Sequence, residues 1–138
     1  MNKYKNLIFV VVVALILGAC AKPETPTNVQ IAEGEWEVEN VIANGELNLP
    51  EGSYFSVNSV LHLDRNETFL FVNVDGRATA GTWTATETNL TLTGTSPEAY
   101  TQDYTIVSLT YDKMHVYRTF LILGNPVEIR YLFRRANR

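Results

Sequence analysis

Four glutamates at alternate positions form the densest group of ionisable side chains in the sequence: Glu33, Glu35, Glu37 and Glu39. Paired carboxylates can carry out acid–base hydrolysis when their environments push their pKa values apart. A spacing of two residues, however, places all four on one face of an extended strand, opposite the apolar side chains between them. We expect these carboxylates to be solvated, and we assign no catalytic residue among them.

Two histidines and one aspartate are the candidates for a metal site. His62 and Asp64 share one strand face, and His115 lies in another apolar run. The sequence lacks the compact His/Asp spacing of strong metal sites. It also lacks a nucleophile elbow, a glycine-rich phosphate loop and a Cys/His pair. We therefore expect a protein that is not an enzyme and that uses neither a metal nor a cofactor.

The only cysteine, Cys20, follows an N-terminal targeting pattern. Lys3 and Lys5 are followed by an apolar run over residues 7–17, and Gly18 and Ala19 directly precede the cysteine. A basic leader, an apolar run and small residues make up a secretory signal. The run is shorter than the roughly 18 residues that a membrane-spanning helix needs. The sequence Leu-Gly-Ala-Cys resembles the lipobox of bacterial lipoproteins.

The resemblance to the lipobox implies that residues 1–19 are a lipoprotein signal peptide, which is removed, and that the thiol of Cys20 is acylated. Several acyl chains hold a protein stably on a membrane. Residues 20–33, which contain two prolines followed by polar residues, are predicted to form a flexible tether after the lipid anchor. We expect a lipoprotein of the outer membrane, on its periplasmic face or at the cell surface.

Charge and length limit what the remaining chain can be. Without residues 1–19 the chain keeps 9 of its 11 basic residues and all 15 acidic ones, which gives a net charge of −6. Such a chain has no basic footprint for nucleic acid. The remaining length suits one modest core, which we place in a single domain over residues 34–138.

The domain shows short β-rich runs separated by turn-forming residues, and no helical periodicity. The first connection, over residues 44–52, is the only long one, and short links favour an antiparallel meander. The eight predicted runs cover residues 35–43, 53–63, 68–74, 80–86, 89–93, 100–109, 113–123 and 126–135.

Alternation gives the first and the last of these runs one apolar face, whereas both faces of the run over residues 113–123 are apolar. Trp36, Val38 and Ile42 share one parity in the first run, and four apolar residues share one parity in the last: Val127, Ile129, Tyr131 and Phe133. Eight such strands form a closed barrel or a two-layer sandwich, and short sequential turns favour the barrel. We predict an all-β fold, an eight-stranded antiparallel up-and-down barrel.

The ends of this predicted barrel resemble the lipocalin pattern. Gly34-Glu35-Trp36 opens the first run and Arg134-Arg135 closes the last. The phrases "LHLDRNETFLF" and "GTWTATETNLTLTG" are similar to those of small lipocalin-like lipoproteins of Bacteroidetes. In lipocalins a Gly-x-Trp motif begins the first strand, and a basic residue from the end of the barrel packs on the tryptophan. The resemblance assigns barrel closure to Gly34, Trp36 and Arg134, with Arg135 as the alternative to Arg134.

The same resemblance implies non-catalytic binding of a small hydrophobic or amphiphilic ligand. Arg118 shares parity with Met114, Val116 and Phe120, so it points into the barrel if that face is internal, where it would match a carboxylate or phosphate head group. If the opposite face is internal, Arg118 is solvated; it could also face inward and pair with an internal acid. The predicted ligand site comprises Arg118, Phe55, Phe69, Phe71, Tyr104 and Phe120.

An alternative function keeps the same fold. Abundant aromatic side chains could fill so short a barrel completely. The protein would then be a cell-envelope interaction module without a ligand. The sequence does not identify the protein partners of such a module.

Overall fold

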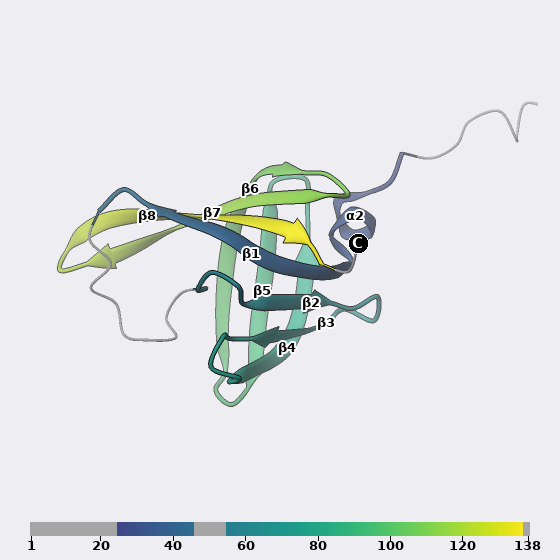
Figure 1. The fold of residues 1–138 in the computed structure, drawn as a ribbon, viewed down its shortest axis with the longest axis horizontal. Helices are drawn as coiled ribbons and strands as arrows, with labels where there is room; N and C mark the ends of the chain where they lie inside the picture. Colours follow the sequence, from purple (N-terminus) through teal and green to yellow (C-terminus); the bar gives the residue numbers. More distant parts are fainter. Residues whose placement is uncertain (1–24, 46–54, 137–138) are drawn as a thin grey trace, which may run out of the picture.

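The computed structural model describes residues 25–45 and 55–136, and within them the chain forms a closed barrel. Each strand pairs antiparallel with the next, and β1 pairs with β8 to close the barrel (Figure 1). The elements are α2 (Asn28–Ala32), β1 (Gly34–Ala43), β2 (Val60–Leu63), β3 (Thr68–Val72), β4 (Ala78–Ala85), β5 (Asn89–Ser96), β6 (Tyr100–Leu109), β7 (Lys113–Ile122) and β8 (Asn125–Arg135). The predicted all-β up-and-down barrel is confirmed. The predicted signal peptide and Cys20 lie outside the described residues.

Alternation along each strand builds the core. On β8, Val127, Ile129, Tyr131 and Phe133 point inward and are at most 7% exposed. On β7 the inward side chains Met114 and Val116 are completely buried. Because strand side chains alternate between faces, the residues between these positions point to solvent. The barrel is therefore filled by alternate side chains of its strands, and the parity changes only where a bulge shifts the register, in the β1–β8, β4–β5 and β6–β7 pairs.

The strand β1 departs from strict alternation because it contains a bulge. Its register against β8 shifts between Val38 and Asn40, and an extra residue in one strand inverts the parity of everything after it. Val38 is fully buried and Val41 packs against the core, whereas Ile42 is 48% exposed. The prediction that Ile42 shares the inward face of Trp36 and Val38 is wrong for this reason.

The second predicted run is longer than the strand it contains. Only Val60–Leu63 forms β2. Before it the chain turns at Val57 and Asn58, where Asn58 has a φ of 71°. Backbone hydrogen bonds from Asn58 N to Val38 O and from Val38 N to Ser59 O, both 2.9 Å, join this turn to β1. The preceding Phe55 is thereby placed inside the barrel, where it is 7% exposed.

The predicted tether contains a helix that packs on one end of the barrel. Thr27 and Gln30 form a capping box, in which Thr27 N donates to Gln30 Oε1 at 2.9 Å. Asn28 Nδ2 donates to Thr86 O at 3.0 Å in the β4–β5 turn, and Ala32 is 1% exposed. The folded unit thus begins before residue 34, which corrects the predicted boundary. This five-residue helix is the only one in the described part of the chain, which therefore holds no helix able to cross a membrane.

Candidate functional site

One end of the barrel is closed by Trp36 and Arg135. Trp36 Nε1 donates to Ala32 O at 2.7 Å, which fixes α2 over the end. The Arg135 guanidinium lies 4.2 Å from the centroid of the Trp36 ring, donates to Glu33 O and Ile31 O at 2.7 and 2.6 Å, and also donates to Tyr111 O. A basic side chain over an indole face is stabilising in itself.

Gly34 leaves the space that Arg135 occupies. Its φ of +131° is disfavoured for other residues, and a Cβ atom there would lie 2.2 Å from Arg135 Nη1. Gly34 and Trp36 therefore lie where the sequence placed them.

The assignment of barrel closure to Arg134 is wrong. Arg134 lies on the outer face and donates from Nη2 to Glu37 Oε1 at 3.0 Å. Parity along β8 explains this difference, since Arg135 shares the inward parity of Tyr131 and Phe133. Residues of one parity line one face of a strand. The parity that Arg135 shares with Tyr131 and Phe133 could therefore have identified it from the sequence.

The four alternate glutamates lie on the outside of the barrel, each beside a basic side chain of another part of the chain. The hydrogen bond from Lys113 lowers the pKa of Glu39, and the charges of Lys113 and Arg134 act in the same direction. The pairs are Glu33 with Arg65 (3.2 Å), Glu35 with His62 (3.6 Å), Glu37 with Arg134 (3.0 Å) and Glu39 with Lys113 (2.7 Å). Glu33, Glu37 and Glu39 thus form surface ion pairs, Glu35 faces His62, and the four carboxylates do not share a cleft.

The histidines are not brought together. His62 faces Glu35 on the outside of the barrel, and burial together with the charge of Arg130 lowers the pKa of His115. Within residues 25–45 and 55–136, no three His, Cys, Asp or Glu side chains gather in a way that could hold a metal ion.

An aromatic cluster fills the middle of the barrel. Phe55 is its centre: its ring centroid lies 4.5 Å from Phe71, 4.9 Å from Tyr131, 5.4 Å from Tyr104 and 5.8 Å from Phe133. A shared acceptor holds Phe55 there, because Ser56 Oγ and Ser59 Oγ donate to Asn73 Oδ1 at 2.6 and 3.0 Å. Aromatic contacts at these separations contribute beyond their buried area. The lumen is therefore largely occupied by the protein itself.

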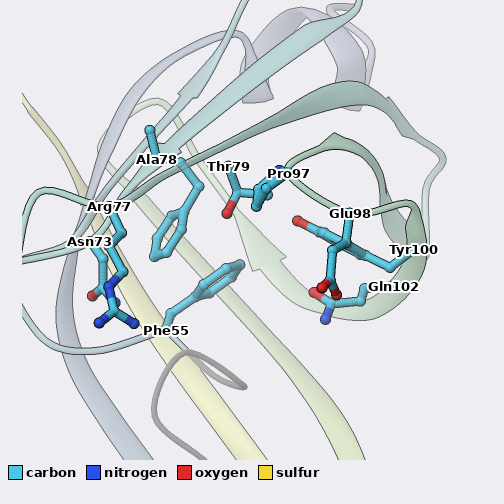
Figure 2. Close-up of a pocket in the computed structure, with 10 residues that line it drawn as sticks. Phe55, Asn73, Arg77, Ala78, Thr79, Pro97, Glu98, Tyr100 and Gln102 are labelled. Carbon is cyan, nitrogen blue, oxygen red and sulfur yellow. The ribbon is translucent and has the colours of Figure 1, made fainter.

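A pocket remains above this cluster, at the end of the barrel opposite α2. Its volume is about 380 Å³, and Phe55 and Phe71 supply the aromatic part of its lining, its apolar floor. Figure 2 shows the Phe55 ring among the polar residues that line the pocket. Its walls come from the β3–β4 connection with the start of β4, and from the β5–β6 connection with the start of β6: Asn73, Arg77, Ala78, Thr79, Pro97, Glu98, Tyr100 and Gln102. The pocket thus combines an apolar floor with a rim that carries one acid, one base and several amides and hydroxyls.

The predicted ligand residues divide between three places. Phe55 and Phe71 line the pocket, whereas Phe69 and Tyr104 are each 2% exposed and belong to the filled core. Tyr104 still contacts the pocket indirectly, because its hydroxyl donates to Gln102 Oε1 at 2.7 Å. Phe120 is partly buried on β7, beside Arg118. The pocket walls were not predicted, although the turns "VDGR" and "GTSPEA" mark them in the sequence.

Arg118 faces inward, which settles the question of parity on β7. The buried side chains Met114 and Val116 share its parity. Its Cζ atom lies 4.5 Å from the centroid of the Phe120 ring, and its Nη1 atom is buried with no hydrogen-bond partner in the described part of the chain. Its charge also acts on Tyr104: burial raises the pKa of the Tyr104 hydroxyl, and Arg118 opposes that rise.

Eight consecutive antiparallel strands, sealed at one end by a Trp–Arg stack and hollowed at the other, define a small up-and-down barrel protein. The sequence model described as the lipocalin-like domain matches residues 33–116, which is more than half of the chain. The chain belongs to this lipocalin-like family.

Comparison with solved structures returns animal odorant-binding proteins. The odorant-binding protein from bovine nasal mucosa is 20% identical, with 85% of this chain and 79% of that chain covered and a TM-score of 0.46. The bovine odorant-binding protein in complex with a selenium-containing odorant is 19% identical, with coverages of 85% and 78% and a TM-score of 0.47. No curated protein sequence matches the chain.

Proposed function

We propose that this protein is a non-catalytic binding protein that takes a small hydrophobic or amphiphilic molecule at the open end of its barrel. The observation that carries the proposal is the pocket of about 380 Å³ over Phe55 and Phe71. A concave site with an apolar floor and a few polar groups at its edge is the usual form of a small-molecule site. Membership of the lipocalin-like family supports the same function.

The filled core sets the size of the ligand. Phe55 occupies the space along the barrel axis that a deep ligand would need, with rings packed around it at 4.5 to 5.8 Å. The remaining volume is near the lower end of the range for small-molecule sites. A compact ligand, or one whose chain extends out of the open end, fits this pocket.

The test is photolabelling of the full chain, reconstituted in phosphatidylcholine nanodiscs, by decanol that carries a diazirine and an alkyne. Two substitutions on β4 form a matched pair. Thr79→Trp fills the pocket, because Thr79 lines it, whereas Thr84→Trp adds the same side chain at an exposed position. We expect labelled peptides from residues 73–79 and 97–102 in the unaltered chain and in T84W, and their loss in T79W. Labelling that T79W leaves unchanged would show that the pocket is not the site.

A second candidate function is a cell-envelope interaction module, and the aromatic filling of the lumen is the observation that favours it. It becomes the better interpretation if neither decanol nor its photoreactive form binds. The two functions are thus separated by the same experiment.

We also propose that the chain is held at the outer membrane through acylation of Cys20, on the evidence of the targeting pattern before it. Mass spectrometry of the N-terminal peptide of the protein, produced in a bacterial host, should show an acylated cysteine as the first residue. Cys20→Ser should abolish both the mass of the acyl groups and the association of the protein with the membrane. Protease added to intact cells then distinguishes a surface location from a periplasmic one. An unmodified Cys20 in the membrane fraction would contradict the proposal.

A further inference from the structure

Arg118 differs from the other arginine and lysine side chains in the described part of the chain in having no anionic or carbonyl partner. The side chains of Arg65, Arg77, Lys113, Arg130 and Arg134 each lie within 3.2 Å of a carboxylate oxygen. Arg135 is held by three backbone carbonyls, and His62 lies 3.6 Å from Glu35. The Arg118 guanidinium instead contacts the face of Phe120, which satisfies none of its N–H donors, and the hydroxyl of Tyr104, a neutral group that supplies no charge.

The unpartnered atom is also buried. Arg118 Nη1 is shielded from solvent and donates to no atom of the described residues. Leaving a charged donor buried and unsatisfied is costly, so such groups normally pair with an anion. The cost at Arg118 is thus unexplained by the fold alone, and an oxyanion with two acceptor atoms would remove it.

The hydrogen-bonded ladder between β6 and β7 ends beside Arg118. The ladder between β6 and β7 runs from Leu109↔Met114 to Thr105↔Tyr117 and then stops, although β6 begins at Tyr100 and β7 continues to Ile122. Figure 1 shows the two strands diverging there, with the β7–β8 hairpin extending away from β6. Arg118 is the first residue of β7 beyond the last pair. Its guanidinium therefore lies where the wall separates.

Tyr104 connects this position to the pocket. Its ring stacks on Phe55 at 5.4 Å, and its hydroxyl donates to Gln102 Oε1, where both Phe55 and Gln102 line the pocket. Tyr104 is also close enough to Arg118 to experience its charge. Arg118 is thus one side chain away from the pocket wall, on the side where β6 and β7 separate.

We propose that Arg118 binds the anionic head group of an amphiphilic ligand, a carboxylate or a similar oxyanion, where the β6–β7 ladder ends. The inference rests on the proposed function and makes its ligand class specific: the apolar part contacts the Phe55–Phe71 floor and the oxyanion reaches Arg118. A guanidinium suits this role because its fork of N–H donors matches a carboxylate with two hydrogen bonds.

The experiment compares decanoate, decanol and acetate on the full chain in phosphatidylcholine nanodiscs, with empty nanodiscs as the blank. Decanoate and decanol share the same chain length, so the charge is the variable between them. Calorimetry gives the affinities. The carbon-13 titration of decanoate labelled at its carboxyl gives the pKa of the bound head group, which a neighbouring guanidinium must lower.

Three variants make the result specific. Arg118→Gln removes the charge, and Arg118→Lys keeps the charge without the fork. Arg130→Gln is the matched control, because Arg130 lies one position along on the paired strand β8 and faces outward onto Glu128 and Tyr117. Thermal unfolding checks that each variant is folded. If R118Q does not fold, R118K and the pKa of decanoate bound to the unaltered chain still decide whether Arg118 binds the head group.

We expect the affinity for decanoate to fall about tenfold or more in R118Q, which is the effect of losing hydrogen bonds to a charged group. The affinity for decanol should be the same in R118Q and in the unaltered chain. R130Q should change neither the affinity for decanoate nor the affinity for decanol. Decanoate that binds equally to R118Q, with an unshifted carboxyl pKa, would overturn the inference while decanol binding upholds the proposed function. If neither decanoate nor decanol binds, both the inference about Arg118 and the proposed function are overturned. If acetate binds as tightly as decanoate, the ligand of Arg118 is a free anion, and the inference that it is an amphiphile is overturned.

Discussion

Arg134 and Arg135 are neighbours with opposite roles, which allows a direct comparison. Arg135→Met removes three hydrogen bonds from a charged donor and the stack on Trp36. We expect it to lower the free energy of unfolding by about 3 kcal/mol. Arg134→Met loses one exposed ion pair with Glu37, which is worth about 0.5 kcal/mol or less. Urea unfolding of the two variants measures the difference, and equal losses would contradict the assignment of barrel closure to Arg135.

Replacing Arg118 should have the opposite effect to replacing Arg135: in the absence of ligand it should raise the free energy of unfolding. Its Nη1 is buried without a partner in the described part of the chain, so replacing it by an apolar side chain of similar length removes a cost. We expect Arg118→Met to raise the free energy of unfolding by about 1 kcal/mol. Thermal unfolding without ligand measures this, and a clear loss of stability would show that Arg118 is satisfied within the fold.

Glu39 should make stability depend on pH. The hydrogen bond from Lys113 Nζ at 2.7 Å lowers the pKa of Glu39. A carboxyl whose pKa is lower in the folded state stabilises the fold above its unfolded pKa, and this contribution is lost as pH falls through the folded pKa. Lys113→Met should raise the Glu39 pKa toward the ordinary range for a carboxyl, as measured by carbon-13 titration, with the charge of Arg134 still acting to lower it. Arg77→Met, at the opposite end of the barrel, should leave it unchanged.

At the level of elements, the runs predicted from alternation and turn chemistry match the strands closely. β6 is found at Tyr100–Leu109, the predicted range, and the edges of β3, β4 and β7 differ by at most two residues. This agreement follows from the physics of antiparallel hairpins, in which turn residues end each strand and one parity is buried. The helix α2 was missed, although Thr27-x-x-Gln30 is a capping-box signal, because its five residues are too few to show a period.

The parts that could not be predicted depend on contacts between elements. The bulge that turns Ile42 outward is set by pairing with β8. The inward position of Phe55 depends on hydrogen bonds from Ser56 and Ser59 to Asn73, a residue of another connection. For the same reason the aromatic residues Phe69 and Phe71 could not be separated into core and pocket. Parity gives the face of a side chain but not its depth along the barrel axis.

The packing of β4 against β5 gives a prediction at this scale. At Gly81 a Cβ atom would lie 2.0 Å from Thr93 O and 2.8 Å from Gly94 Cα, both backbone atoms that cannot move aside cheaply. Gly81→Ala should therefore force the two strands apart and cost about 2 kcal/mol or more. Thr82→Ala, on the outer face of the same strand, should cost about 0.5 kcal/mol or less. Circular dichroism during urea unfolding checks both, and a G81A variant as stable as T82A would contradict the close approach.

For the whole molecule, the arrangement of the two ends decides how an anchored protein would present its pocket. The described chain begins at residue 25 beside α2, at the sealed end, and the pocket lies at the opposite end between the β3–β4 and β5–β6 connections. The five residues from Cys20 to residue 25 can span at most about 18 Å. If Cys20 is acylated as we propose, the sealed end is held near the membrane and the open end faces away from it.

Energy transfer to a rhodamine-labelled lipid in liposomes tests this orientation. A fluorophore at Glu87→Cys, in the β4–β5 turn beside α2, marks the sealed end, and one at Val74→Cys, in the β3–β4 turn, marks the open end. We expect strong transfer from position 87 and weak transfer from position 74, since transfer falls steeply with distance from the lipid surface. Stronger transfer from position 74 would place the pocket against the membrane, so that its ligand would come directly from the lipid phase. Weak transfer there leaves the pocket open to the aqueous side, where an amphiphile must arrive as a dissolved monomer or be handed over by another protein.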